Sequence, residues 1–267
     1  PGTYDLILSD AEFVQQLNAA GYIEEMNPDD YPLDDMLHED FSQFPGHWAD
    51  GKMYSMILRG GHLGVSYNKN SVTAKEAESY SCFWKPELKG KVGHFDWHLP
   101  NLGQMSLYDG NGASLWNLND TQWSKVQETT MSLRPQIGGF FDYGGTFNGL
   151  KNGEMQAMVG IGDWITGVLE KDGAPVASVI PKEGGIQFTE SYSIGKGSEK
   201  AEEAKKFIQY MMSPAGQVKS AQMLAYPGFC VTKAGRAALI EADLAEAKRS
   251  HQIDGDAQDP ITLIKEG

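Results

Sequence analysis

Apolar residues alternate between short extended runs and helix-spaced patterns along most of the chain. The extended runs predict strands, and they lie at 4–9, 53–58, 63–68, 91–97, 155–161, 176–180 and 188–194. Apolar side chains recur at near-helical spacing in the segments between them, at 11–20, 101–108, 120–133, 145–152 and 163–172. Strands that alternate with helices predict an α/β fold with mixed sheets and flanking helices.

Residues 199–213 carry the clearest amphipathic helix pattern. Ala204, Phe207 and Ile208 recur on one face, and Ser198 stands where a capping side chain is expected. Pro214 follows the pattern and predicts its end, because proline cannot continue a helix.

Two segments lack a periodic pattern. Residues 22–52 are rich in Asp, Pro and Gly, and we predict a surface connection with short helical turns. Arg59-Gly60-Gly61-His62 predicts a loop whose glycines serve a backbone turn.

Composition and charge narrow the class of protein. The chain has 267 residues and a formal net charge of -14, from 36 Asp and Glu against 22 Lys and Arg. This charge argues against a nucleic-acid partner, which needs clustered basic residues. No run approaches the roughly 18 apolar residues of a membrane-spanning helix. The length favours two lobes over one core.

Several absences limit the chemistry. The chain has no nucleophile elbow, no dinucleotide fingerprint and no phosphate loop, so these motifs indicate neither an enzyme nor a bound cofactor. Cys82 and Cys230 alone cannot form a disulfide framework or a multi-cysteine metal site. The chain begins at Pro1 without a leader pattern and opens directly on a strand, so we expect the N-terminal part of the fold to be missing.

His94-x-Asp96-x-His98 is the pattern closest to a metal site. Alternate residues of a strand point to one face, so the three side chains could converge on a metal ion. No fourth ligand is identifiable, and histidines at strand ends are often simply hydrogen-bonded. We therefore predict no metal site and keep a metal-binding protein or enzyme as an alternative.

Acidic and aromatic residues gather where predicted strands meet helices. Asp10 and Glu12 follow the first predicted strand, and Asp163 and Trp164 follow the strand at 155–161. Phe188 and Glu190 stand at the beginning of the last predicted strand. In open α/β sheets ligands bind at such junctions, and carboxylates with aromatic rings suit a cation. The alternative is that Asp10 and Asp163 only cap helices and that the aromatic rings belong to the core.

Four motifs, in order and spacing, resemble the bacterial spermidine/putrescine-binding proteins of ABC importers. They are Trp84–Gly90, Pro181–Gly185, the helix 199–213 with Ser213-Pro214, and Ala225-Tyr226-Pro227. The resemblance implies a two-lobed, type II periplasmic-binding-protein fold. Lobe one would comprise 1–67 and 190–234 and be incomplete, and lobe two would comprise 68–189 and 235–267.

The resemblance also assigns candidate ligand-binding residues. Tyr226 matches a ligand-contacting tyrosine, Glu190 replaces an aspartate that pairs with an amine, and Phe188 replaces the tryptophan before it. Asp10 and Glu12 fall where the family has a serine and a tyrosine.

Three further positions depart from the family pattern. His98 and Asn101 fall where polyamine binders place two acids. Gly162 stands where a stacking tryptophan is expected, and Trp164 could swing into that space.

These residues lead to one functional hypothesis and its alternatives. We expect a monomeric periplasmic, or extracellular and lipid-anchored, receptor that captures a polyamine or related small amine and delivers it to an ABC transporter permease. Glu190, Asp10 and Glu12 would pair with ammonium groups. A receptor of the same fold for a zwitterionic amino acid or opine, with Arg59 or His98 binding the carboxylate, is the first alternative, and an interaction scaffold is the last.

Overall fold

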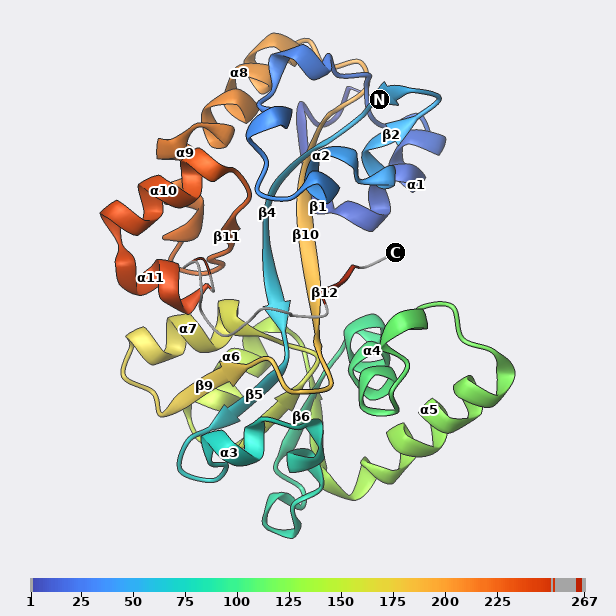
Figure 1. The fold of residues 1–267 in the computed structure, drawn as a ribbon, viewed down its shortest axis with the longest axis vertical. Helices are drawn as coiled ribbons and strands as arrows, with labels where there is room; N and C mark the ends of the chain where they lie inside the picture. The colour runs from blue at the N-terminus through green and yellow to red at the C-terminus, as the bar shows by residue number, and fades with distance from the viewer. Residues whose placement is uncertain (1, 251, 253–262, 266–267) are drawn as a thin grey trace. The chain divides into compact units, whose positions relative to one another are not determined.

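The computed structural model describes residues 2–250, 252 and 263–265, and the chain forms two compact units (Figure 1). The first unit comprises Pro1–Gly61 and Phe188–Asp256, and the second comprises His62–Gln187 and Ala257–Gly267.

Two strands carry the chain from one unit into the other. They are β4 (Met56–Leu63) and β10 (Gly185–Ile194), which are neighbours in one sheet (Figure 1). The unit boundaries at 61/62 and 187/188 fall inside these strands, each a few residues before the predicted boundaries at 67/68 and 189/190.

The sheet of the first unit has the strand order β1-β10-β4-β11. β1 (Leu6–Asp10) runs antiparallel to β10, and β11 (Phe229–Cys230) runs antiparallel to β4. At the far end of β10, Gly185 to Gln187 pair in parallel with β12 (Leu263–Lys265). These paired residues belong to the second unit. The first unit also contains a separate two-stranded ribbon of β2 (Trp48–Ala49) and β3 (Lys52–Met53).

Six α-helices belong to the described part of the first unit. They are α1 (Val14–Ala19), α2 (Glu39–Gln43), α8 (Ala201–Met212), α9 (Pro214–Ala221), α10 (Lys233–Ala242) and α11 (Leu244–Arg249). α8 buries Ala204 and Ile208, as its amphipathic pattern predicts, and also Met212, whereas Phe207 of the predicted face is exposed. The predicted cap is wrong, because Lys200 is the N-cap residue and the Ser198 hydroxyl instead donates to Asp5 Oδ1 at 2.7 Å.

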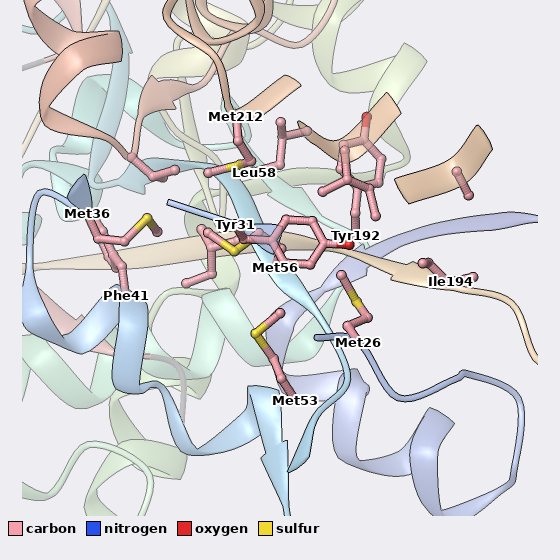
Figure 2. Close-up of a cluster of buried hydrophobic side chains, with 14 of the residues drawn as sticks. Met26, Tyr31, Met36, Phe41, Met53, Met56, Leu58, Tyr192, Ile194 and Met212 are labelled. Carbon is pink, nitrogen blue, oxygen red and sulfur yellow. The ribbon is translucent and has the colours of Figure 1, made fainter. Parts of the chain in front are cut away.

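The segment 22–52 is more than a surface connection. Met26, Tyr31, Met36 and Phe41 lie in the core of the first unit with side chains from β4, β10 and α8 (Figure 2). The short helical turns were predicted, whereas the burial was not. An irregular backbone shows no period from which the buried positions could be recognised.

The predicted loop Arg59–His62 is wrong, because these residues lie inside β4. A Cβ atom at Gly60 would lie 2.5 Å from the carbonyl oxygen of Phe188 and 2.5 Å from a ring carbon of Phe229. Glycine at this position therefore permits close packing within the sheet rather than a turn.

The sheet of the second unit is mixed and has the order β7-β6-β8-β5-β9. β6 pairs in parallel with β7 and β8, whereas β5 is antiparallel to β8 and β9. The strands are β5 (Val65–Asn68), β6 (Val92–Phe95), β7 (Ile137–Phe141), β8 (Ala157–Val159) and β9 (Val176–Val179). The helices are α3 (Ala74–Ala77), α4 (His98–Tyr108), α5 (Asp120–Ser132), α6 (Tyr143–Lys151) and α7 (Asp163–Lys171).

The C-terminal helices differ from the predicted lobe assignment. Residues 235–250 group with the first unit, not with the second. The physical reason is a small apolar cluster in which Leu239 of α10 and Ala247 of α11 pack with Ala221 and Cys230. Among the described residues, no helix is both long and apolar enough to span a membrane.

Candidate functional site

Three charged residues form a row across the sheet of the first unit. Asp10 on β1 is the register partner of Glu190 on β10, and Arg59 lies on the next strand, β4. Directly opposed residues of an antiparallel pair share one face, with Cβ atoms about 5 Å apart. Two carboxyl groups are thus held side by side, which is unfavourable unless a cation compensates them.

Arg59 supplies that compensation from the buried strand β4. Its side chain is 6% exposed, and its Nε donates to Glu190 Oε2 in a buried ion pair. Its Nη1 donates to the carbonyl oxygen of Tyr226 at 2.9 Å and lies 2.9 Å from Met223 Sδ. The guanidinium carbon is 4.8 Å from the centre of the Tyr226 ring, a cation–π distance. Arg59 therefore holds both Glu190 and Tyr226.

Two aromatic rings adjoin the charged row. Phe188 stands two positions before Glu190 on β10, and alternation places both side chains on one face of the strand. The Phe188 and Tyr226 rings meet edge to face, with centroids 6.1 Å apart. Phe188 is buried and Tyr226 half-buried, so Tyr226 presents the more accessible aromatic surface.

The carboxyl group of Asp10 lies in a strongly negative environment. Its pKa is raised from 3.8 to about 7, chiefly by burial and then by the charges of Glu12 and Glu190, while the charge of Arg59 lowers it. Both carboxylate oxygens of Glu12 are buried, so Glu12 acts on Asp10 through its charge. Asp10 is the N-terminal neighbour of a 3-10 helix, Ala11–Phe13, but its side chain makes no capping hydrogen bond. Capping therefore does not explain Asp10.

The second unit brings Asp163 and Trp164 against the end of β4. Asp163 begins α7, and its Oδ1 accepts a hydrogen bond from the main-chain N–H of His62 at 3.3 Å. His62 Nδ1 is 3.9 Å from Asp163 Oδ2. Trp164 is buried, and its ring lies against Gly162, where a Cβ atom would be 2.8 Å from Trp164 Cζ3. The ring thus adjoins the space left by glycine at 162.

His98 and Asn101 differ in accessibility although both lie on α4. His98 is the first residue of the helix and is exposed. Asn101 is buried, and its Nδ2 donates to the carbonyl oxygens of Phe95 (2.8 Å) and Trp97. Asn101 therefore fastens the connection between β6 and α4, and His98 is the member of the pair open to a ligand.

The pattern His94-x-Asp96-x-His98 does not converge. His94 belongs to β6, but His98 belongs to α4, so the three residues do not share one strand face. His94 Nδ1 lies 2.9 Å from the carbonyl oxygen of Phe95, and its ring contacts Phe140. Within the described residues, no group of His, Cys, Asp and Glu could hold a metal ion. The strand was predicted to continue to residue 97, whereas β6 ends at Phe95.

The structure thus assembles part of the predicted site within each unit. Asp10, Glu12, Phe188, Glu190 and Tyr226 gather in the first unit. His98, Asn101, Asp163 and Trp164 belong to the second unit.

Sequence reasoning missed the bond between Arg59 and Glu190. A usable signal was present, because a charged residue inside an apolar run needs a buried partner of opposite charge. Had residues 56–63 been predicted as one strand, Arg59 would have required such a partner.

Comparisons with known proteins agree with the predicted fold and family. The model of a family described as bacterial extracellular solute-binding protein matches residues 1–246. The spermidine/putrescine-binding periplasmic protein 1 of Haemophilus influenzae is 26% identical over 230 residues, which are 85% of this chain and 61% of that protein. The chain therefore spans less than two thirds of that relative's length.

Solved structures share the fold at low sequence identity. The spermidine/putrescine ABC transporter substrate-binding protein PotD from Streptococcus pneumoniae aligns with a TM-score of 0.79 at 18% identity, covering 99% of this chain and 78% of that one. The PBP MotA of A. tumefaciens B6, solved in complex with glucopine, aligns with a TM-score of 0.75 at 15% identity, covering 99% and 78%. These likenesses confirm the predicted type II periplasmic-binding-protein fold.

Proposed function

The chain belongs to the bacterial extracellular solute-binding proteins, and from that membership we propose that it is the substrate-binding protein of an ABC importer. It captures a polyamine or a related small amine and delivers it to a membrane permease. The name of the H. influenzae relative supports this substrate class. The same name supports the periplasmic location that we propose, and an extracellular, lipid-anchored location is the alternative.

The observation that carries the amine assignment is the charged row of the first unit. Arg59 is bonded to Glu190, whereas Asp10 lies beside two further carboxyl groups, and its pKa is raised to about 7. A bound ammonium group would stabilise the ionised form of Asp10. The half-buried Tyr226 ring adds a face on which a cation or its carbon chain can pack.

The zwitterion alternative is less well supported by the same contacts. A solute carboxylate would need a basic partner, and the guanidinium of Arg59 is buried and bonded to Glu190 and Tyr226. His98 remains exposed at the start of α4. Ligands with and without a carboxylate therefore separate the two proposals.

The test is calorimetry on ligand-free protein with putrescine, spermidine, γ-aminobutyrate and an opine. We expect the polyamines to bind with roughly micromolar affinity, about -8 kcal/mol, and the carboxylated amines at least tenfold more weakly. Asp10→Asn should lower polyamine affinity about tenfold or more, because the ammonium group loses its ionised partner.

Asp29→Asn is the matched control, since Asp29 is an exposed aspartate of the same unit. It should leave the affinity unchanged. Binding only of the carboxylated amines would transfer the assignment to a zwitterionic solute. Equal loss in both variants would remove Asp10 from the site.

A further inference from the structure

The buried guanidinium of Arg59 changes how many carboxyl groups the first unit offers to a ligand. Glu12 and Glu190 act on Asp10 through their charge, and Arg59 is the cation that opposes them. Among these three acids, Glu190 forms a hydrogen-bonded ion pair with Arg59. An ion pair buried to this extent is not exchanged freely for a ligand ammonium, because separation would leave a desolvated charge uncompensated.

Arg59 also fixes the position of the aromatic residue beside the row. Nη1 donates to the main-chain oxygen of Tyr226, and the guanidinium lies under the Tyr226 ring. One side chain thus holds an acid and an aromatic ring from two separate segments of the chain. Its contacts to Glu190 and Tyr226 use the planar, multidentate donor geometry that lysine lacks.

We propose that Arg59 is a positioning residue that determines charge specificity: it holds Glu190 as an internal counterion and leaves Asp10 as the carboxyl group that contacts an ammonium group. Because Glu190 is bonded to Arg59 and both carboxylate oxygens of Glu12 are buried, the first unit then offers Asp10 to one ammonium group of the ligand. This inference rests on the proposed amine-binding function and adds to it a preference by ligand charge. Glu190, predicted from the sequence to pair with an amine, instead serves the protein's own arginine.

The experiment compares the ratio of spermidine to putrescine affinity in matched variants. Arg59→Met removes the cation and releases Glu190, so the more highly charged spermidine should gain on putrescine by about threefold or more. Arg59→Lys keeps the charge but loses the donor geometry, so both affinities should fall while their ratio stays near that of the wild type. Lys52→Met removes a cation from an exposed ion pair of the same unit and should leave the ratio unchanged.

A double variant protects the test against misfolding. Arg59→Met with Glu190→Gln removes both members of the pair and should restore the wild-type ratio. Glu190→Gln alone leaves Arg59 uncompensated, so it should weaken both amines and shift the ratio toward putrescine. If Arg59→Met does not fold, these two variants still test the proposal. A charge role predicts that the affinity ratio shifts in Glu190→Gln and returns to the wild-type value in the double variant, whereas a merely structural role predicts the same ratio in both.

The pH profile of binding gives a second readout. The groups acting on Asp10 are Glu12, Glu190 and Arg59, and Arg59 lowers its pKa. Without Arg59, Asp10 should ionise at a higher pH. The pH at which putrescine affinity rises should therefore be higher in Arg59→Met than in the wild type. If the wild-type protein binds neither putrescine nor spermidine, the proposed function fails. If it binds both, and the variants change neither the ratio of the two affinities nor the pH dependence of binding, only the role of Arg59 is overturned.

Discussion

The two units each place a basic residue of β4 beside a buried acid, but they do so by different means. In the first unit, the permanently charged Arg59 bonds Glu190 through its side chain. In the second, Asp163 accepts from the main chain of His62, and the imidazole nitrogen is 3.9 Å from the carboxylate. The first contact depends on the identity of a side chain, whereas the second is largely a property of the backbone. Substitutions should therefore affect the two units unequally.

The largest expected effect follows from breaking the side-chain pair. Arg59→Met should lower the free energy of unfolding by about 3 kcal/mol, because Glu190 keeps its charge without its partner. His62→Gln should cost less than about 1 kcal/mol, because the hydrogen bond from the main-chain N–H to Asp163 survives. Urea denaturation of both variants measures the difference.

The double variant of Arg59 and Glu190 is the control for this comparison. It should recover most of the stability lost in Arg59→Met, since no buried charge is left unpaired. Equal losses in Arg59→Met and His62→Gln would contradict the distinction between the two units.

A somewhat smaller effect should come from crowding the backbone of the second unit. A Cβ atom at Gly162 would lie 1.8 Å from the carbonyl oxygen of His62, so something must shift. Gly162→Ala should cost about 2 kcal/mol, more than His62→Gln, because it displaces the backbone that holds Asp163.

Gly144→Ala provides the matched control on α6. There the added Cβ would meet only an Asp142 oxygen at 3.8 Å, and alanine suits a helix better than glycine. Thermal unfolding should place this variant at or slightly above the wild type. A Gly162→Ala variant as stable as Gly144→Ala would show that the contact at His62 adjusts without cost.

In the first unit, the acids of the charged row could be predicted from the sequence, but the bond that Arg59 makes could not. Asp10 and Glu190 were identified because each stands near the end of a predicted strand; in the structure Asp10 ends β1, whereas Glu190 lies inside β10. Their cross-strand pairing then follows from the fold. Arg59 was misplaced because Gly60-Gly61 suggests a turn, and sequence alone does not distinguish glycines of a turn from glycines that permit close packing.

The second unit shows a different limit. Asp163 and Trp164 were correctly placed at a helix start, but their environment depends on His62, a residue distant in sequence. The residues of the metal-like histidine pattern do not share one strand face, because β6 ends at Phe95 and His98 begins α4. Element boundaries decide which side chains share a face, and local sequence determines these boundaries least well.

The smallest expected effect tests whether the first unit carries an uncompensated acid that the Arg59 pair does not neutralise. The folded-state pKa of Asp10, about 7, is raised above its ordinary value of 3.8, so between these values the folded protein binds the proton more strongly than the unfolded chain. Stability should therefore fall as pH rises from about 4 to 7, and the loss should level off above that range. Because Asp10 is only partly buried, we expect a loss of about 1 kcal/mol.

Asp10→Asn removes the titrating group, so its melting temperature should fall less across this pH window and exceed that of the wild type at pH 8. Asp29→Asn should retain the wild-type slope, since Asp29 is exposed and distant in sequence from the charged row. Saturating putrescine should also reduce the wild-type slope, because an ammonium group favours the ionised Asp10. An identical slope in wild type and Asp10→Asn would mean that Arg59 already balances all three acids, and the first unit would then hold no carboxyl group in reserve for an amine.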